Sequence, residues 1–156
     1  MTQQTPSSID SRYQLKSGSE LDYILAGKAA LIIFTEKPKV PGRDTIKLFI
    51  SKHIARDQWF IRPYGYDANI GLLEKHPDNT YTIKPLNGAL SNNKNYSYYY
   101  EGFRNIFIML QRKELPDFIK LYHLGKCSYC SRTLTDPRSI ELGIGPECRK
   151  RLAITP

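Results

Sequence analysis

The chain has 156 residues, of which 40% are hydrophobic and 24% are charged, and this balance is typical of a globular protein and not of a disordered chain. Lys and Arg outnumber Asp and Glu by 23 to 15, so the formal charge is +8, which favours a polyanionic partner. The polar N-terminus has no apolar signal segment, and the longest apolar run, residues 29–34, is too short to span a membrane. We therefore expect a cytoplasmic protein without a membrane partner, in which the cysteines stay reduced.

Residues 1–19 are rich in Ser, Thr and Gln, so we expect a flexible arm there. An apolar, β-branched run follows over residues 28–36, and Ile46, Leu48 and Ile50 then alternate with their neighbours as in a half-buried strand. Further strands are expected from Trp59 onward, over residues 70–74 and over residues 81–84. Short turn segments separate these runs, and short connections fit antiparallel pairing. The pattern predicts a four- or five-stranded antiparallel meander.

A helix over about residues 97–113 is predicted next, with Ser97 as its cap and Pro116 beyond its end. Its apolar face recurs at three- and four-residue spacing: Tyr99, Phe103, Ile106, Phe107 and Leu110. A last strand, over residues 118–123, runs directly into the cysteine segment.

The predicted fold class is therefore α+β, with a small antiparallel β-sheet, one packing helix and a C-terminal knuckle like that of a zinc ribbon or treble clef. Residues 1–19 would form the arm, residues 20–116 the β-rich body and residues 117–156 the knuckle lobe.

All three cysteines of the chain lie in this C-terminal lobe. Cys127 and Cys130 form a CxxC pair, whose two-residue spacing lets both thiolates reach one ion, and Cys148 follows 18 positions later. Pro146 suits the first turn of a helix, where the helix dipole favours a thiolate such as that of Cys148. Because closed thiolate-rich sites hold zinc structurally, we expect one structural Zn²⁺ ion.

The fourth ligand of that ion is not a cysteine. His123 lies four residues before Cys127 and is the predicted ligand. Asp136 is the alternative, although an Asp followed by Pro also predicts a helix N-cap. The other two histidines lie more than forty residues earlier in the sequence, in the body: His53 and His76.

The run from Gly125 to Cys148 reads GKCSYCSRTLTDPRSIELGIGPEC. It resembles a family of uncharacterised phage and mobile-element proteins whose zinc knuckle has the pattern CxxCxRxLTxPxSxxxGxGPxC. Ser131 departs from that family, which usually has Gly after the second cysteine, and an easy left-handed turn residue is thereby lost. The resemblance implies zinc and a phage-like origin, and it implies no particular reaction.

Basic side chains of the lobe are the predicted contacts to the phosphates of DNA or RNA: Arg132, Arg138, Arg149, Lys150 and Arg151. Trp59 and Tyr98 lie in two aromatic segments that also carry cations, and they are the predicted stacking partners of bases. Each prediction has a structural alternative. Periodicity places about half of the aromatic side chains in the core, and a solvated helix end also carries basic residues.

Motifs of catalysis are absent from the sequence. There is no nucleophile elbow, HExxH helix or Walker loop, and the segment at residues 143–145 lacks the lysine and the preceding strand of a phosphate loop. Zinc deaminases need an HxE segment before their CxxC pair, and none precedes this one. We therefore expect no enzymatic activity.

Two functions remain. The first is a nucleic-acid-binding accessory protein of phage or mobile-element type, in which a structural zinc ion stiffens a basic lobe. The alternative is a phage-encoded inhibitor that binds a host protein of the defence or transcription machinery. The salt dependence of binding distinguishes the two functions, because nucleic-acid binding releases counterions and weakens steeply as the salt concentration rises.

Overall fold

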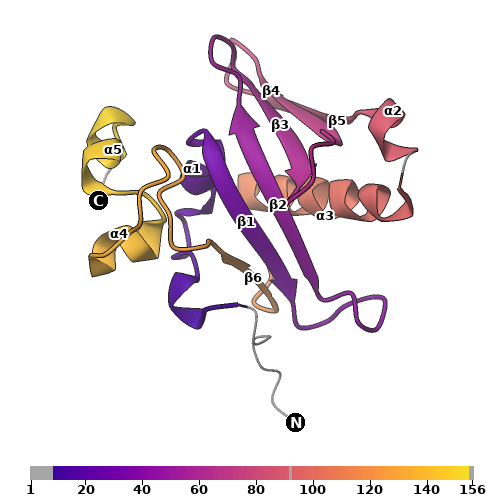
Figure 1. The fold of residues 1–156 in the computed structure, drawn as a ribbon, viewed down its shortest axis with the longest axis horizontal. Helices are drawn as coiled ribbons and strands as arrows, with labels where there is room; N and C mark the ends of the chain where they lie inside the picture. Colours follow the sequence, from indigo (N-terminus) through magenta and orange to yellow (C-terminus); the bar gives the residue numbers. More distant parts are fainter. Residues whose placement is uncertain (1–8, 92, 155–156) are drawn as a thin grey trace.

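A six-stranded antiparallel sheet forms the centre of the protein, whose computed structural model describes residues 9–91 and 93–154 (Figure 1). The strand order is β5-β4-β3-β2-β1-β6. The strands are β1 (Lys28–Thr35), β2 (Thr45–Lys52), β3 (Gln58–Pro63), β4 (Gly71–Lys75), β5 (Tyr81–Pro85) and β6 (Ile119–Tyr122). Strands β1 to β5 are neighbours in space as they are in sequence, which confirms the predicted meander. Strand β6 joins it at the free edge of β1.

Side-chain alternation gives the sheet a core face and a second face, which we call the open face. The core face of β2 buries three apolar residues: Ile46, Leu48 and Ile50. On the open face of the same strand, Lys47 is exposed and Phe49 is partly exposed. Register extends both faces across the sheet, because Leu48 pairs with Leu31 of β1 while Phe49 pairs with Arg62 of β3.

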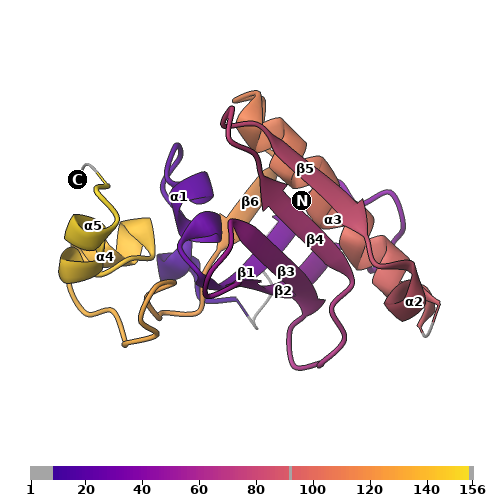
Figure 2. The same ribbon diagram turned by 90° about the horizontal axis from the view of Figure 1, so that it is seen from above.

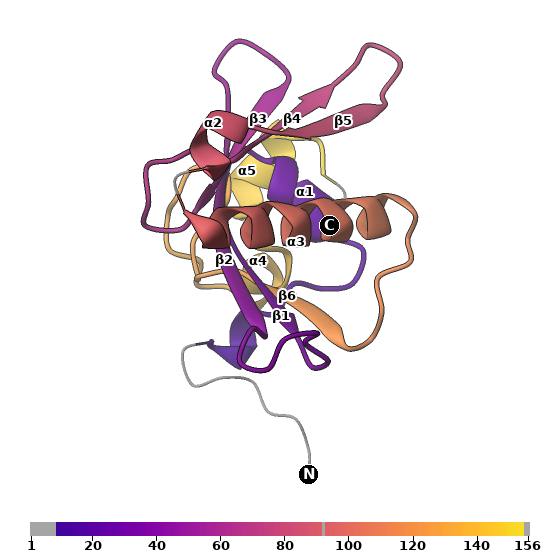
Figure 3. The same ribbon diagram turned by 90° about the vertical axis from the view of Figure 1, so that its right-hand side faces the viewer.

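Helix α3 (Lys94–Gln111) covers the core face, and Figures 2 and 3 show it running along that side of the sheet. It begins earlier than residue 97, because the side chain of Asn93 caps it by accepting a hydrogen bond from the Asn95 N–H (2.9 Å). Its buried face is Tyr96, Tyr100, Phe103, Ile106, Phe107 and Leu110, so Tyr100 takes the place predicted for Tyr99. The short helix α2 (Asn87–Leu90) precedes it. No helix in the described parts of the chain, α3 included, is long and apolar enough to span a membrane.

The segment before the first strand packs against the sheet. A 3₁₀ turn, η1 (Ser11–Tyr13), and helix α1 (Glu20–Leu25) flank Leu15, which is buried and whose N–H donates to the Leu121 carbonyl (2.8 Å). Ile9 is also buried, against Ile32 and Phe34 on the open face of β1. The predicted arm was therefore too long at its C-terminal side. Its first part, residues 1–8, lies outside the described residues.

The lobe follows β6 and contains helices α4 (Pro137–Leu142) and α5 (Pro146–Arg151), beside α1 and η1 (Figure 1). Backbone hydrogen bonds attach it to the body: the Lys16 N–H donates to the Glu141 carbonyl (3.0 Å), and the Lys28 N–H donates to the Ser128 carbonyl (2.6 Å). Because β6 is a strand of the sheet, the lobe begins after Tyr122 and not at residue 117.

Candidate metal centre

Cys127 and Cys130 lie in a tight knuckle that backbone hydrogen bonds close. The Ser131 N–H donates to the Cys127 carbonyl (2.9 Å), and the Cys127 N–H donates to the Arg132 carbonyl (2.8 Å). Ser131 has φ +67°, so the position at which the resembled family usually has Gly does adopt the left-handed conformation. Lys126 then pairs with Thr133 in an antiparallel bridge, which makes the knuckle the tip of a short hairpin.

Helix α4 links the knuckle to the third cysteine. Asp136 caps it by accepting a hydrogen bond from the Ser139 N–H (3.0 Å), which is the helix-capping interpretation of the Asp-Pro pair. Gly143 ends it with φ +72°, and a Cβ atom there would collide with the ring of Tyr23. The lobe is thus packed on the body through a position that only glycine fits.

Helix α5 brings Cys148 to the knuckle from its first turn. Gly145 is the N-cap residue, and Pro146 occupies the first turn, as the sequence predicted. Arg149 holds this helix to the turn before it, because its guanidinium donates to the Ile144 carbonyl (2.6 Å) and to the Ser139 hydroxyl (2.9 Å). Arg149 is therefore a structural residue of the lobe.

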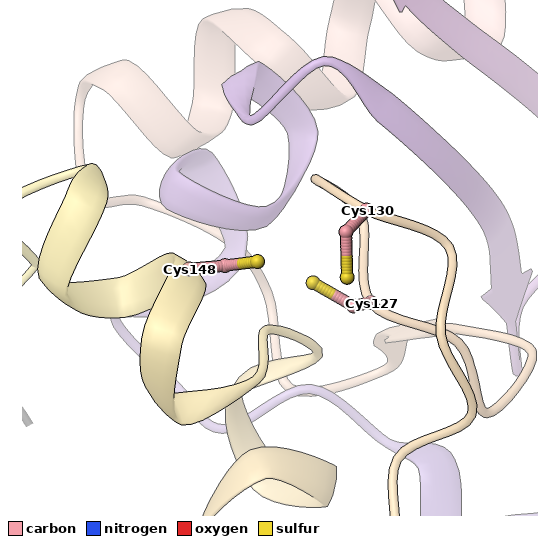
Figure 4. Close-up of side chains that lie close together, drawn as sticks. All are labelled: Cys127, Cys130 and Cys148. Carbon is pink, nitrogen blue, oxygen red and sulfur yellow. The ribbon is translucent and has the colours of Figure 1, made fainter.

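The three cysteine sulfurs point toward one another (Figure 4) and all lie within 4.8 Å of each other. Tetrahedral zinc with Zn–S bonds of about 2.3 Å needs sulfurs about 3.8 Å apart, so this cluster fits a metal ion with little movement. Cys127 and Cys148 are buried and Cys130 is exposed. A knuckle, a hairpin and a helix start that together present three thiols are consistent with a zinc knuckle, and these cysteines could hold a metal ion.

Backbone N–H groups favour the thiolate form of Cys127. Burial raises the pKa of its thiol, but hydrogen bonds from the N–H groups of Gly145, Cys130 and Tyr129 outweigh burial and leave the pKa below its ordinary value. Two of these N–H groups, those of Tyr129 and Gly145, lie 3.4 Å from the sulfur. The pKa of Cys148 is shifted in the opposite direction, because burial and hydrogen bonding with the other two cysteines raise it. The cluster thus presents the Cys127 sulfur ready to bind a cation, and the Cys148 thiol releases its proton when a cation arrives.

His123 does not join the cluster, so its prediction as the fourth ligand receives no support from this arrangement. The metal-binding group contains only the three cysteines among the described His, Cys, Asp and Glu residues. His123 is 1% exposed and both its ring nitrogens are engaged: Nδ1 accepts from the Gly125 N–H (2.8 Å), and Nε2 lies 2.6 Å from the Ile140 carbonyl. With Nδ1 as acceptor, Nε2 carries the proton and donates it, so the imidazole is neutral. Its ring packs against those of Tyr13 and Tyr23, and burial lowers its pKa. Through these contacts His123 connects the lobe to the body.

A pocket of about 360 Å³ opens beside the cysteines, and all three of them line it. Arg132 and Arg151 also line it, and both side chains are exposed. Within the described residues neither guanidinium takes part in an ion pair. The pocket therefore combines a cluster of thiols with two cations that form no ion pair, and the carboxylates of Asp136 and Glu147 line it as well.

The other predicted phosphate contacts of the lobe are engaged within their own helices. Arg138 pairs with Glu141 (3.2 Å) and Lys150 with Glu147 (3.8 Å), in both cases one helical turn apart. Such exposed pairs are weak, so these cations remain available to solvent. Of the five predicted basic residues, only Arg132 and Arg151 are brought together at one concave site.

The two aromatic residues predicted to stack on bases are placed differently. Trp59 is 3% exposed, and its indole N–H donates to the Leu25 carbonyl (3.1 Å), so its ring lies in the core and not on a surface where a base could stack. Tyr98 is partly exposed, but its hydroxyl donates to the Arg43 carbonyl (2.7 Å) and the Arg43 guanidinium lies 4.7 Å from its ring centre.

The sheet's open face carries aromatic rings that were not among the predicted site residues. Phe49 and Phe60, on neighbouring strands, are partly exposed there. The Arg62 guanidinium lies 4.6 Å from the centre of the Phe49 ring, and the Lys47 ammonium lies 5.5 Å from that of Tyr64. The alternation in β2 and β3 contains this signal, because the residues between the buried ones must face the other side.

Comparison with known proteins concerns the lobe alone. Residues 122–153 match a family described as a family of unknown function (DUF6011). No curated protein and no solved structure matches the chain. The predicted phage or mobile-element origin receives no support from this match and stays a prediction. The knuckle lobe, from the end of β6 through α5, is similar to an uncharacterised protein family, as its sequence pattern predicted.

Proposed function

We propose that this protein binds single-stranded nucleic acid on the open face of its sheet, while a zinc ion in the lobe holds one end of that face in place. The observation that carries the proposal is the alternation of aromatic rings and cations on β2 and β3. Single-stranded nucleic acid offers unpaired bases and phosphates at similar spacing, and exposed sheet aromatics are a common platform for its bases.

The rings lie where successive bases can stack. Phe49 pairs in register with Arg62, and Phe60 pairs with Leu72 on the next strand, so the two rings and the guanidinium occupy adjacent positions of one face. Arg62 already stacks on Phe49. A base can stack on Phe60 directly and on the outer plane of Arg62, since guanidinium planes stack as aromatic rings do.

Charge on this face favours a polyanion. Five cations stand at open-face positions, each on a different strand of the sheet: Lys28, Lys47, Arg62, Lys84 and Lys120. The last of them, Lys120, pairs with Glu36 (3.8 Å). Among the described residues of β2 to β5, the acidic residue at an open-face position is Glu74, and Lys84 pairs with it (3.4 Å). Phosphate contacts from such cations supply most of the affinity of sequence-independent binding.

Zinc suits the lobe because three thiolates form a soft ligand set, and Cys127 is supported by backbone N–H groups. Its proposed role is structural. The carbonyl of the knuckle residue Ser128 accepts the hydrogen bond from the N–H of Lys28 at the start of β1 (2.6 Å), so ordering the knuckle also orders one edge of the open face. On this proposal the protein acts by binding and not by catalysis.

A host-protein partner would use the same face, because Phe49, Phe60 and Leu72 also offer apolar surface there. The interleaved cations favour the nucleic acid. A protein partner is therefore one outcome of the binding test and not a second proposal.

The test is fluorescence anisotropy of labelled single-stranded DNA and RNA with zinc-loaded protein, at about 50 and 200 mM salt. We expect binding that weakens steeply with salt, and weaker binding to duplex DNA of the same length. Phe60→Ala should weaken it about 5- to 150-fold, since one base stack contributes ~1–3 kcal/mol. Lys47→Ala combined with Arg62→Ala should weaken it and flatten the salt dependence, because fewer counterions are released.

Two controls match these variants. Ile54 is 98% exposed between β2 and β3, and Ile54→Ala should leave binding unchanged. Lys39→Ala removes an exposed charge outside the sheet and should change affinity little. If no oligonucleotide binds at about 50 mM salt, or if Phe60→Ala and Ile54→Ala behave alike, the proposal is wrong, and capture of a protein partner by the same face becomes the hypothesis to test.

A further inference from the structure

The metal cluster has three protein ligands and a pocket where a fourth would stand. Tetrahedral zinc needs a fourth donor, and the described His, Cys, Asp and Glu residues place no further ligand atom in the group. Both nitrogens of His123 are engaged, and the carboxylate of Asp136 is engaged as the cap of α4. The nearest carboxylate on α5, that of Glu147, faces Lys150.

The side of helix α5 that carries Cys148 also contains the position from which a fourth protein ligand could reach the metal. Residues three positions apart lie on the same side of a helix, so the side chain that follows Cys148 on its own side belongs to Arg151. A second cysteine at that position would complete the site with four thiolates. Arg151 instead lines the pocket together with all three cysteines and Arg132.

The charges define what fits there. Three thiolates and one Zn²⁺ ion carry a net charge of −1. Two carboxylates also line the pocket, but Asp136 is engaged as the cap of α4 and Glu147 pairs with Lys150, so the two guanidiniums are the side-chain charges there that are left for a ligand. A guanidinium is a donor of hydrogen bonds to anions, and Arg suits planar or multi-oxygen anions in particular. The pocket, of about 360 Å³, has room for a small molecule next to the metal position.

We propose that the metal of this lobe keeps its fourth coordination position open to the pocket, where it exchanges a small exogenous anion that Arg132 and Arg151 hold. The metal would then hold the lobe together and also bind an anion, because its coordination is not closed by the protein alone. This inference rests on the metal binding proposed above but not on nucleic-acid binding.

The test uses full-length protein loaded with Co²⁺, whose visible absorption reports its ligands, and adds azide or 2-mercaptoethanol. We expect a thiolate-rich tetrahedral spectrum that shifts as either probe binds, with saturation at one probe per metal. Arg132→Ala and Arg151→Ala should keep the metal and weaken azide binding about tenfold each, because each removes a charged hydrogen-bond donor.

Arg151→Cys gives the sharper result. It should convert the spectrum to that of four thiolates and abolish the response to azide, because the open position is then filled from α5. Lys150→Cys is the matched control, since position 150 lies off the side that carries Cys148 and should leave the response intact.

The outcomes are distinguishable. If the protein binds no Co²⁺, the proposed metal site itself fails. If Co²⁺ binds but the spectrum ignores both probes, the fourth position is filled by the protein and this inference is overturned. Identical spectra of Arg151→Cys and Lys150→Cys would overturn it as well.

Discussion

The body and the lobe of this protein are stabilised in different ways. The body buries a continuous apolar core between the sheet and α3, with large side chains such as Leu48, Ile61 and Phe103 fully buried. In its described residues, up to Ile154, the lobe has two short helices, and its centre is a cluster of thiols bounded by backbone hydrogen bonds. In the body, burial is shared among many apolar side chains. In the lobe a few residues each make a contact that no neighbouring residue can replace.

The two regions are not independent. His123 and Gly143 of the lobe pack against Tyr23 of α1, whose hydroxyl donates to the Ala30 carbonyl of β1 (2.7 Å). The lobe is therefore held in place by its packing against the body. Substitutions can distinguish the contribution of the metal from that of the contacts between lobe and body. Their expected effects range from loss of the ion to a slight gain in stability.

Loss of one metal ligand should have the largest effect. Cys148→Ser leaves two thiolates, and we expect zinc content to fall from about one ion per chain to a small fraction of that, because structural sites depend on every ligand. Metal analysis after dialysis measures it. Lys150→Ala, on the same short helix, is the control and should keep its zinc. Retention of a full equivalent by Cys148→Ser would contradict the proposed ligand set.

Gly143→Ala should lower the free energy of unfolding by about 2–4 kcal/mol, because the new Cβ meets the ring of Tyr23 at a backbone conformation that favours glycine. Urea unfolding measures the change. Gly88→Ala in α2 is the matched control, since a Cβ there meets nothing within 4 Å. Equal stability of the two variants would show that the lobe does not pack on Tyr23 as described.

His123→Ala should lower the free energy of unfolding by about 1–3 kcal/mol while zinc content stays at one ion per chain. The destabilisation follows because the variant leaves the Gly125 N–H and the Ile140 carbonyl without their partner. His76→Ala is the control, because that ring makes an exposed contact with Thr82. Loss of zinc from His123→Ala would restore His123 as a ligand.

Ser128→Ala should have the smallest effect and the opposite sign. Ser128 is fully buried, and among the described residues its hydroxyl is the buried side-chain atom that lacks a hydrogen-bond partner. Removing an unsatisfied hydroxyl should be neutral or stabilise the protein by up to about 1 kcal/mol. Ser139→Ala, which removes the acceptor of the Arg149 hydrogen bond, should destabilise it instead. Thermal unfolding of the two variants compares them, and a large loss of stability in Ser128→Ala would reveal a partner for its hydroxyl.

The same contrast explains what could be predicted from the sequence. In the body, alternation at Ile46, Leu48 and Ile50 predicted β2 because strand burial has a period of two residues. The start of α3 was misplaced, because the capping residue Asn93 lies in a polar loop with several possible caps. Phe49 and Phe60 could have been assigned to the open face from the same alternation.

In the lobe, spacing predicted the three cysteines but not their surroundings. His123 has the right residue type and lies close to Cys127 in sequence, yet its Nε2 contacts the carbonyl of Ile140, 17 residues later. That contact depends on where α4 lies relative to the segment that follows β6, which no local pattern encodes. Asp136 was assigned correctly as a cap because Asp followed by Pro is a local signal.

Hydrogen exchange of the zinc-loaded and the chelator-treated protein, followed by mass spectrometry, tests most directly whether metal holds the lobe while apolar burial holds the body. We expect chelation to remove amide protection from residues 124–153, while β1 to β4 and α3 stay protected. Protection lost throughout the chain would mean that the body depends on the metal as well. Protection unchanged in the lobe would mean that no metal holds it.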